Sequence, residues 1–144
     1  MTSVTESTPR VTHVLETALY AEDLARSAEF YRRTFGFEAL VDTPRLVALD
    51  VGGRDVLLLF QRGATAEGLE TDSGWIPPHD GSGPTHFAFA IEREDLEKWA
   101  QRLAALDIAV ESRVEWERGG SSLYFRDPDG RSVELVTPGT WATY

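Results

Sequence analysis

Hydrophobic and polar residues alternate in short runs along most of this chain, and two longer stretches repeat apolar residues at helical spacing. Residues 22–34 and 92–106 are these longer stretches, and their periodicity predicts two amphipathic helices. Gly36 follows the first stretch, as is typical of a helix C-terminus. The alternating runs predict strands at residues 11–20, 37–41, 46–51, 56–60, 85–91, 108–115, 121–126 and 132–137.

The predicted order of one strand, one helix and three strands occurs twice along the chain. Residues 53–58 (GRDVLL) align with residues 130–135 (GRSVEL), and residues 16–19 align with residues 86–89. A unit of about 70 residues that occurs only twice indicates paired modules and not a solenoid. We therefore expect an α+β fold of paired βαβββ modules, which form a concave, cup-like mixed β-sheet with helices on the outer face.

The composition changes between the two modules. Residues 62–84 contain five glycines and three prolines and show no periodicity. We expect modules at 11–61 and 84–138 within one domain (11–138), joined by a loop at 62–83 that covers the cup as a lid. The remaining segments are an expected disordered tail at 1–10 and a C-terminal tail at 139–144.

Side chains alternate between the two faces of a strand, so strand parity predicts which residues line the cup. The repeat brings four equivalent positions together, and three of them carry donors: Glu16, His86 and Glu134. The fourth position, Leu57, has none. One histidine with two carboxylates suits a borderline divalent ion, so the sequence predicts a three-ligand metal site. The other residues expected to line the cup are Ala18, Leu59, Ala88, Ser122 and Tyr124.

Charge and composition exclude several classes of function. The formal net charge of −10 argues against nucleic acid as a partner, because phosphates require a basic face. The absence of cysteine excludes disulfides and thiolate metal sites. No run of about 18 apolar residues occurs, and the first ten residues lack the apolar core of a signal peptide. We therefore expect a cytoplasmic protein that does not bind membranes.

Three motifs give the chain a family resemblance: residues 23–31 (DLARSAEFY) leading to 35–37 (FGF), residues 85–89 (THFAF), and residues 122–135 (SLYFRDPDGRSVEL). The stretch from about 11 to 138 resembles the vicinal oxygen chelate superfamily, which includes glyoxalase I, bleomycin-resistance proteins, extradiol dioxygenases and fosfomycin-resistance transferases. The resemblance places metal ligands at Glu16, His86 and Glu134. It also implies a homodimer in which modules pair across subunits.

The resemblance implies a divalent metal (Mn, Fe, Zn or Ni) that binds a small oxygenated substrate through adjacent oxygens, in lyase, isomerase or transferase chemistry. This chain departs from several relatives. Glu16 stands where many members have histidine, and Leu57 cannot serve as the fourth ligand and base of glyoxalase I. Ala18 stands where fosfomycin transferases place threonine, and their phosphonate-binding lysine and arginine have no clear counterpart.

Further residues are candidates for contact with the substrate. We expect Tyr124 and Glu16 to be catalytic, and Ser122, Tyr124, Trp75, His79 and Trp141 to bind substrate. Ordinary packing is the alternative for Tyr124, Trp75 and Trp141. For Glu16 the alternative is a buried acid paired with a nearby arginine, and for His79 a histidine of the loop without a functional role. Three arginines are candidates for binding an anionic substrate: Arg113, Arg118 and Arg126.

Other functions stay open at this point. The first alternative is a metal-free protein of the bleomycin-resistance type, whose cup and acidic surface sequester a cationic antibiotic. A second is an extradiol-type dioxygenase, although those enzymes place two histidines and one glutamate around iron. A third is a dimeric module with a vestigial cup. The metal content of the purified protein separates the metalloenzyme from the antibiotic-binding protein and from the module with a vestigial cup.

Overall fold

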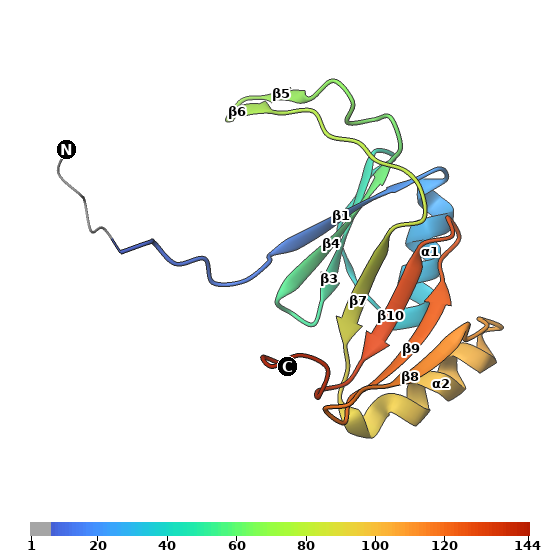
Figure 1. Cartoon of the computed structure of the whole chain (residues 1–144). Coiled ribbons are helices and arrows are strands. Elements are labelled where there is room, and N and C mark those ends of the chain that lie inside the picture. The colour runs from blue at the N-terminus through green and yellow to red at the C-terminus, as the bar shows by residue number, and fades with distance from the viewer. Residues whose placement is uncertain (1–6) are drawn as a thin grey trace.

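The computed structural model describes residues 7–144 and contains two four-stranded sheets, one for each βαβββ module (Figure 1). The first sheet has the order β1-β4-β3-β2 and the second has the order β7-β10-β9-β8. In each sheet the first strand of the module pairs in parallel with the last. The α+β fold of paired modules is therefore confirmed. Among the described residues, no helix is long and apolar enough to cross a membrane.

The bounds of the elements are as follows. The first module consists of β1 (Glu16–Ala21), α1 (Leu24–Phe35), β2 (Ala39–Asp42), β3 (Leu46–Val51) and β4 (Asp55–Gln61). The second consists of β7 (His86–Ala90), the 3-10 turn η1 (Arg93–Asp95), α2 (Leu96–Ala105), β8 (Ser112–Glu115), β9 (Ser121–Arg126) and β10 (Ser132–Val136). Between the modules lies a hairpin of β5 (Leu69–Thr71) and β6 (Gly74–Ile76).

The ends of α1 follow from its sequence. Asp23 has an extended backbone, and its side chain accepts a hydrogen bond from the backbone N–H of Arg26, which starts the helix two residues later than periodicity predicted. Gly36 adopts a φ of 73° and donates its N–H to the carbonyl of Arg32, which ends the helix. The apolar side of α1 packs against β3 and β4, because its Leu24, Ala28 and Tyr31 belong to the same buried cluster as residues of these strands.

Helix α1 packs against both modules at once. Its Tyr31 belongs to the core cluster of the first module, while Phe30 and Phe35 contact the clusters of both modules. The ring of Phe35 lies 4.9 Å from that of Phe89, and the ring of Phe30 lies 6.5 Å from that of Phe125. Aromatic contacts of this kind add to the burial of apolar surface. Aromatic side chains of α1 therefore bridge the two core clusters on the helix side of the sheets.

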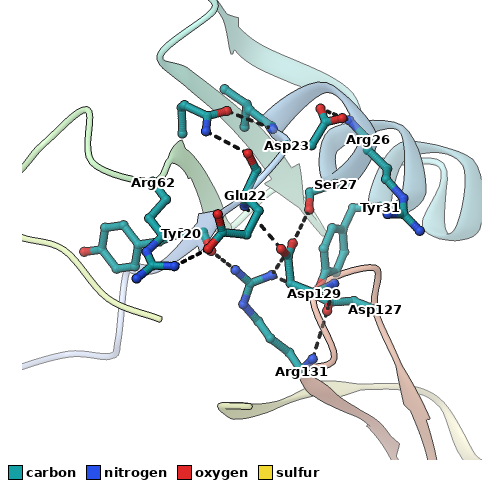
Figure 2. A network of polar contacts seen from close by, with 12 residues as sticks. Tyr20, Glu22, Asp23, Arg26, Ser27, Tyr31, Arg62, Asp127, Asp129 and Arg131 are labelled. Carbon is teal, nitrogen blue, oxygen red and sulfur yellow. Dashed lines mark hydrogen bonds and ion pairs between the residues drawn. The ribbon is translucent and has the colours of Figure 1, made fainter. Parts of the chain in front are cut away.

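A buried ion pair lies where the β9–β10 hairpin meets the first module (Figure 2). Arg131 and Asp127 are almost fully buried, and Arg131 Nη1 lies 2.8 Å from Asp127 Oδ2. The hydroxyl of Tyr31 in α1 donates to the same oxygen at 2.6 Å. Burial, and next the charge of Asp127, raise the pKa of Tyr31 well above its usual value, so this hydroxyl remains a donor.

The same network extends to the N-terminal end of α1. Asp129 accepts hydrogen bonds from the Ser27 hydroxyl at 2.7 Å and from the Glu22 N–H at 3.2 Å. Arg131 also donates to Asp129 and to the backbone carbonyl of Tyr20 at the end of β1. Burial opposes the ionisation of Asp129, but these hydrogen bonds and Arg131 lower its pKa overall. The hairpin is therefore held to both β1 and α1.

Several expected element bounds were wrong. The strand expected at 11–20 is shorter and begins at Glu16, and the one expected at 108–115 begins at Ser112. The helix expected at 92–106 is divided into η1 and α2, and the stretch expected to be irregular, 62–83, contains the β5–β6 hairpin. Part of the expected tail at 1–10 lies outside the described residues. The predicted domain and module boundaries stay predictions.

We predict that Tyr31→Phe lowers the free energy of unfolding by about 1.5–3 kcal/mol, because the variant removes a hydrogen bond to a buried carboxylate. Urea unfolding measures this change. The matched control is Tyr144→Phe, because Tyr144 is exposed and its hydroxyl donates to the backbone carbonyls of Ile91 and Val136. Equal effects of the two substitutions would contradict the importance of the buried network.

Candidate functional site

The second sheet brings His86 and Glu134 together on the face opposite the helices. His86 begins β7, and Glu134 lies in β10 beside Ala88. His86 Nε2 is 3.2 Å from Glu134 Oε1. Two of the three residues expected to bind metal therefore lie side by side within one chain.

Neighbouring groups fix the orientation of both side chains. His86 Nδ1 lies 2.9 Å from the carbonyl of Ser132, and a carbonyl only accepts, so Nδ1 carries the hydrogen. The other nitrogen, Nε2, is thus directed at Glu134. Glu134 Oε2 accepts from the Ser122 hydroxyl at 2.5 Å, and Ser122 Oγ accepts from Trp116 Nε1 at 2.8 Å. Supporting contacts of this type orient metal ligands in known sites.

Burial distinguishes the two side chains. The side chain of Glu134 is 9% exposed, whereas that of His86 is 50% exposed. A buried carboxylate needs hydrogen bonds or a nearby cation to offset the loss of water. Ser122 supplies one hydrogen bond, and the open side of the carboxylate faces His86. A cation could therefore approach Glu134 from the side of His86.

Tyr124 completes this part of the face. Its ring lies 6.1 Å from that of His86, at an interplanar angle of 28°, and Tyr124 pairs with Glu134 across β9 and β10. Burial, followed by the negative charge of Glu134, raises the pKa of Tyr124. At neutral pH the hydroxyl therefore keeps its proton and is suited to donate it, not to act as a base.

Glu16 is on the corresponding face of the first sheet. It shares that side of β1 with Ala18 and Tyr20, because alternate residues of a strand point the same way. Within residues 7–144 of a single chain, His, Asp and Glu side chains form no group of three that could hold a metal. One chain alone therefore does not assemble the expected triad, and the assignment of Glu16 as a ligand stays a prediction.

The expectation that Leu57 and Leu59 line the cup was wrong. Both are buried in the helix-side core of the first module. Leu58 pairs with Ala18, as Glu134 pairs with Ala88, so Leu58 is the structural counterpart of Glu134.

The alignment of residues 53–58 (GRDVLL) with residues 130–135 (GRSVEL) matched Glu134 to Leu57, one residue before its structural counterpart Leu58. The partner of Glu16 is Val56, three residues after Gly53, while the partner of His86 is Ser132, two residues after Gly130. Leu58 also lacks a donor, so the first module contributes no counterpart to Glu134.

The loop at 62–83 returns to the sheet at His79. His79 Nδ1 lies 2.6 Å from the hydroxyl of Tyr20, and its ring lies 4.8 Å from that of Phe60. Tyr20 and Phe60 pair across β1 and β4 on the same face as Ala18. Trp75 and Trp141 are mostly exposed, at 56% and 72%. The contribution of these two tryptophans to a binding site stays a prediction.

Two of the arginines considered for an anionic substrate are already neutralised. Arg113 forms ion pairs with Glu97 and Glu115, and Arg126 pairs with Glu111. Sequence reasoning also missed two residues near the face. Tyr20 could have been found from its parity with Glu16, whereas no sequence signal marks Trp116 as the partner of Ser122.

Comparison with known proteins places these features in context. The family model described as "Glyoxalase/Bleomycin resistance protein/Dioxygenase superfamily" matches residues 10–135. Metallothiol transferase FosB from Bacillus licheniformis is 34% identical over 116 residues, which cover 80% of this chain and 68% of that protein. Catechol-2,3-dioxygenase from Bacillus subtilis is 31% identical over 136 residues, 94% of this chain and 43% of that protein.

Among solved structures, the lactoylglutathione lyase from Agrobacterium tumefaciens superposes with a TM-score of 0.84 and 36% identity. The match covers 93% of this chain and 99% of the lyase chain. The names of these three relatives describe a transferase, a dioxygenase and a lyase. The likeness therefore does not choose among these reactions.

We predict that Leu57→Glu and Leu58→Glu differ sharply in stability. Leu57→Glu buries a carboxylate in the core and should cost about 3 kcal/mol or more. Leu58→Glu places the same group on the open face and should cost about 1 kcal/mol. Urea unfolding of the two variants gives the comparison. If Leu58→Glu were the more damaging change, the assignment of faces on β4 would be wrong.

Proposed function

This chain belongs to the glyoxalase/bleomycin resistance protein/dioxygenase superfamily, and we propose that it is a metal-dependent enzyme in which His86 and Glu134 bind a divalent ion. The 3.2 Å separation of His86 Nε2 and Glu134 Oε1 carries this proposal. Two ligand atoms about 2.1 Å from one ion, at a tetrahedral or octahedral angle, lie roughly 3.0–3.4 Å apart. The observed spacing fits a shared ion.

The chemistry of the pair supports the same conclusion. Because His86 Nδ1 donates to the Ser132 carbonyl, Nε2 of the neutral imidazole carries the lone pair that a metal needs. The facing oxygen of Glu134 is also an acceptor, and a cation between the two atoms would offset their repulsion. Imidazole with carboxylate favours Mn, Fe, Zn or Ni, the set that we propose, over soft metals.

We propose Glu16 of a second copy as the third ligand. Glu16 lies on the open face of the first sheet, while His86 and Glu134 lie on the open face of the second. A homodimer that pairs the first module of one copy with the second module of the other would join these faces into a complete cup. This arrangement is consistent with the absence of a three-residue cluster within residues 7–144 of one chain.

The proposed reaction acts on a small substrate with adjacent oxygens. When bound, the metal acts as a Lewis acid on such oxygens. Tyr124, which retains its proton, donates to a substrate oxygen, while Glu16 serves as both ligand and proton acceptor. Ser122 holds Glu134 in place. One histidine with two carboxylates differs from the triad of iron oxygenases, so we favour lyase, isomerase or transferase chemistry.

A metal-free binding protein is the second candidate. The net charge of −10 favours a cationic ligand, which would suit sequestration of an antibiotic. In that case His86 and Glu134 would form an ordinary histidine–carboxylate pair. Metal binding by the purified protein separates the two functions.

We predict that the purified protein binds Mn²⁺ and that His86→Ala and Glu134→Gln each weaken this binding at least 100-fold, because each removes one ligand. Isothermal titration calorimetry measures the affinity. His13→Ala is the control, since His13 is exposed and, within residues 7–144, its side chain hydrogen-bonds only to Thr12. Mn²⁺ binding that is unchanged in all three variants would reject a metal site at His86 and Glu134. An unsubstituted protein that binds no Mn²⁺ would instead favour the metal-free candidate.

We further predict that the site is completed across the dimer. Glu16→Ala and His86→Ala chains should each lose high-affinity Mn²⁺ binding as homodimers. Co-expressed chains should regain one intact site per heterodimer, because the Glu16→Ala chain supplies His86 and Glu134 and its partner supplies Glu16. Differential tags isolate the heterodimer for titration. If it binds no Mn²⁺, or if light scattering shows a 16 kDa monomer, completion across subunits is wrong.

A further inference from the structure

A cavity of about 220 Å³ adjoins His86 on the side of the first module. β1 contributes Ala18 and Tyr20 to its wall, and residues 81–83, Thr85 and His86 line another side. One cavity therefore connects His86 with Tyr20. Its volume would accommodate a short chain of atoms that extends from a group bound at His86.

Tyr20, which lines this cavity, is held firmly through its pairing with His79. Three contacts fix it: the 2.6 Å hydrogen bond between the Tyr20 hydroxyl and His79 Nδ1, the tilted contact of the two rings at 5.6 Å, and the packing of Gly81 on the Tyr20 ring. A Cβ at Gly81 would lie 2.9 Å from that ring, so the approach requires glycine. Two hydrogen bonds connect Thr65 with His79: the His79 N–H donates to the Thr65 carbonyl, and the Thr65 hydroxyl donates to the His79 carbonyl.

Arg131 lines the cavity, but the charged groups connected with Arg131 and with Tyr20 are negative in sum. The guanidinium of Arg131 is paired with Asp127 and Asp129, and that of Arg62 is paired with Glu22. Asp80 lies close enough to Tyr20 to raise the pKa of its hydroxyl, after the larger effect of burial. The formal charges of these two arginines and four carboxylates sum to −2; the carboxylates are Glu22, Asp80, Asp127 and Asp129. An anion at this end would meet repulsion and no unpaired arginine among these groups.

We infer that the substrate extends from the metal ligands into this cavity and ends in a neutral or cationic hydrogen-bonding group, which is bound by the Tyr20 hydroxyl that His79 orients. The inference rests on the proposed function, because it requires the chelating part of the substrate at His86 and Glu134. It assigns the substrate a class: adjacent oxygens at one end, and a hydroxyl, amide or amine at the other. A phosphonate or carboxylate tail is disfavoured.

Three catechols with matched tails test this inference on the Mn²⁺-loaded protein under anaerobic conditions. They are 3,4-dihydroxyphenylethanol, dopamine and 3,4-dihydroxyphenylacetate, which chelate alike but carry a neutral, a cationic and an anionic end. Calorimetry should show the first two binding at least 10-fold more tightly than the third. Tyr20→Phe should weaken 3,4-dihydroxyphenylethanol about 5-fold, the value of one hydrogen bond, and leave Mn²⁺ and unsubstituted catechol unaffected.

Tyr144→Phe is the control, because its hydroxyl bonds to the carbonyls of Ile91 and Val136 and does not line the cavity. Equal affinities for the three tails, or tighter binding of the carboxylate, would overturn the inference while leaving the metal site intact. Loss of unsubstituted catechol binding in Tyr20→Phe would also overturn it. A protein that binds neither Mn²⁺ nor catechol would overturn the inference and the proposed function together.

Discussion

The structure depends on the buried ion pair between Asp127 and Arg131 in the β9–β10 turn, whose hydrogen bonds with Tyr31 and Tyr20 connect the second module to the first. Breaking a buried pair by removing one partner typically costs about 3–5 kcal/mol, because the other charge is left without compensation. Here the pair is tied to α1 by the Tyr31 hydroxyl and to β1 by the Tyr20 carbonyl (Figure 2). A polar network in which the members satisfy one another specifies one arrangement of the modules.

That arrangement determines where the candidate site lies. Arg131 immediately precedes β10, so its anchorage positions the strand that carries Glu134. β10 in turn pairs with β7, which places His86 within 3.2 Å of Glu134. The same guanidinium borders the cavity that leads to Tyr20. A residue of the hairpin turn thus connects the stability of the fold to both the metal pair and the adjoining cavity.

Much of this organisation could be predicted from the sequence, because local periodicity encodes it. The repeated pattern gave the two modules, and strand parity correctly placed His86 and Glu134 on one face. The position of Leu57 was wrong because a one-residue difference in register changes the face of a side chain and leaves the hydrophobic pattern intact. Strand parity places Tyr20 on the face of Glu16, but its hydrogen bond to His79 joins residues 59 positions apart, which no local pattern encodes. The Trp116–Ser122 hydrogen bond is local, but it depends on side-chain geometry that the hydrophobic pattern does not specify.

The central claim is that His86 and Glu134 bind a divalent ion together with Glu16 of a second copy. Diffraction from crystals grown with Mn²⁺, recorded near the manganese absorption edge, tests it most directly. The account predicts one anomalous peak about 2.0–2.3 Å from His86, from Glu134 and from Glu16 of the partner subunit. A peak at other residues, or crystals saturated with Mn²⁺ that show no peak between His86 and Glu134, would contradict it.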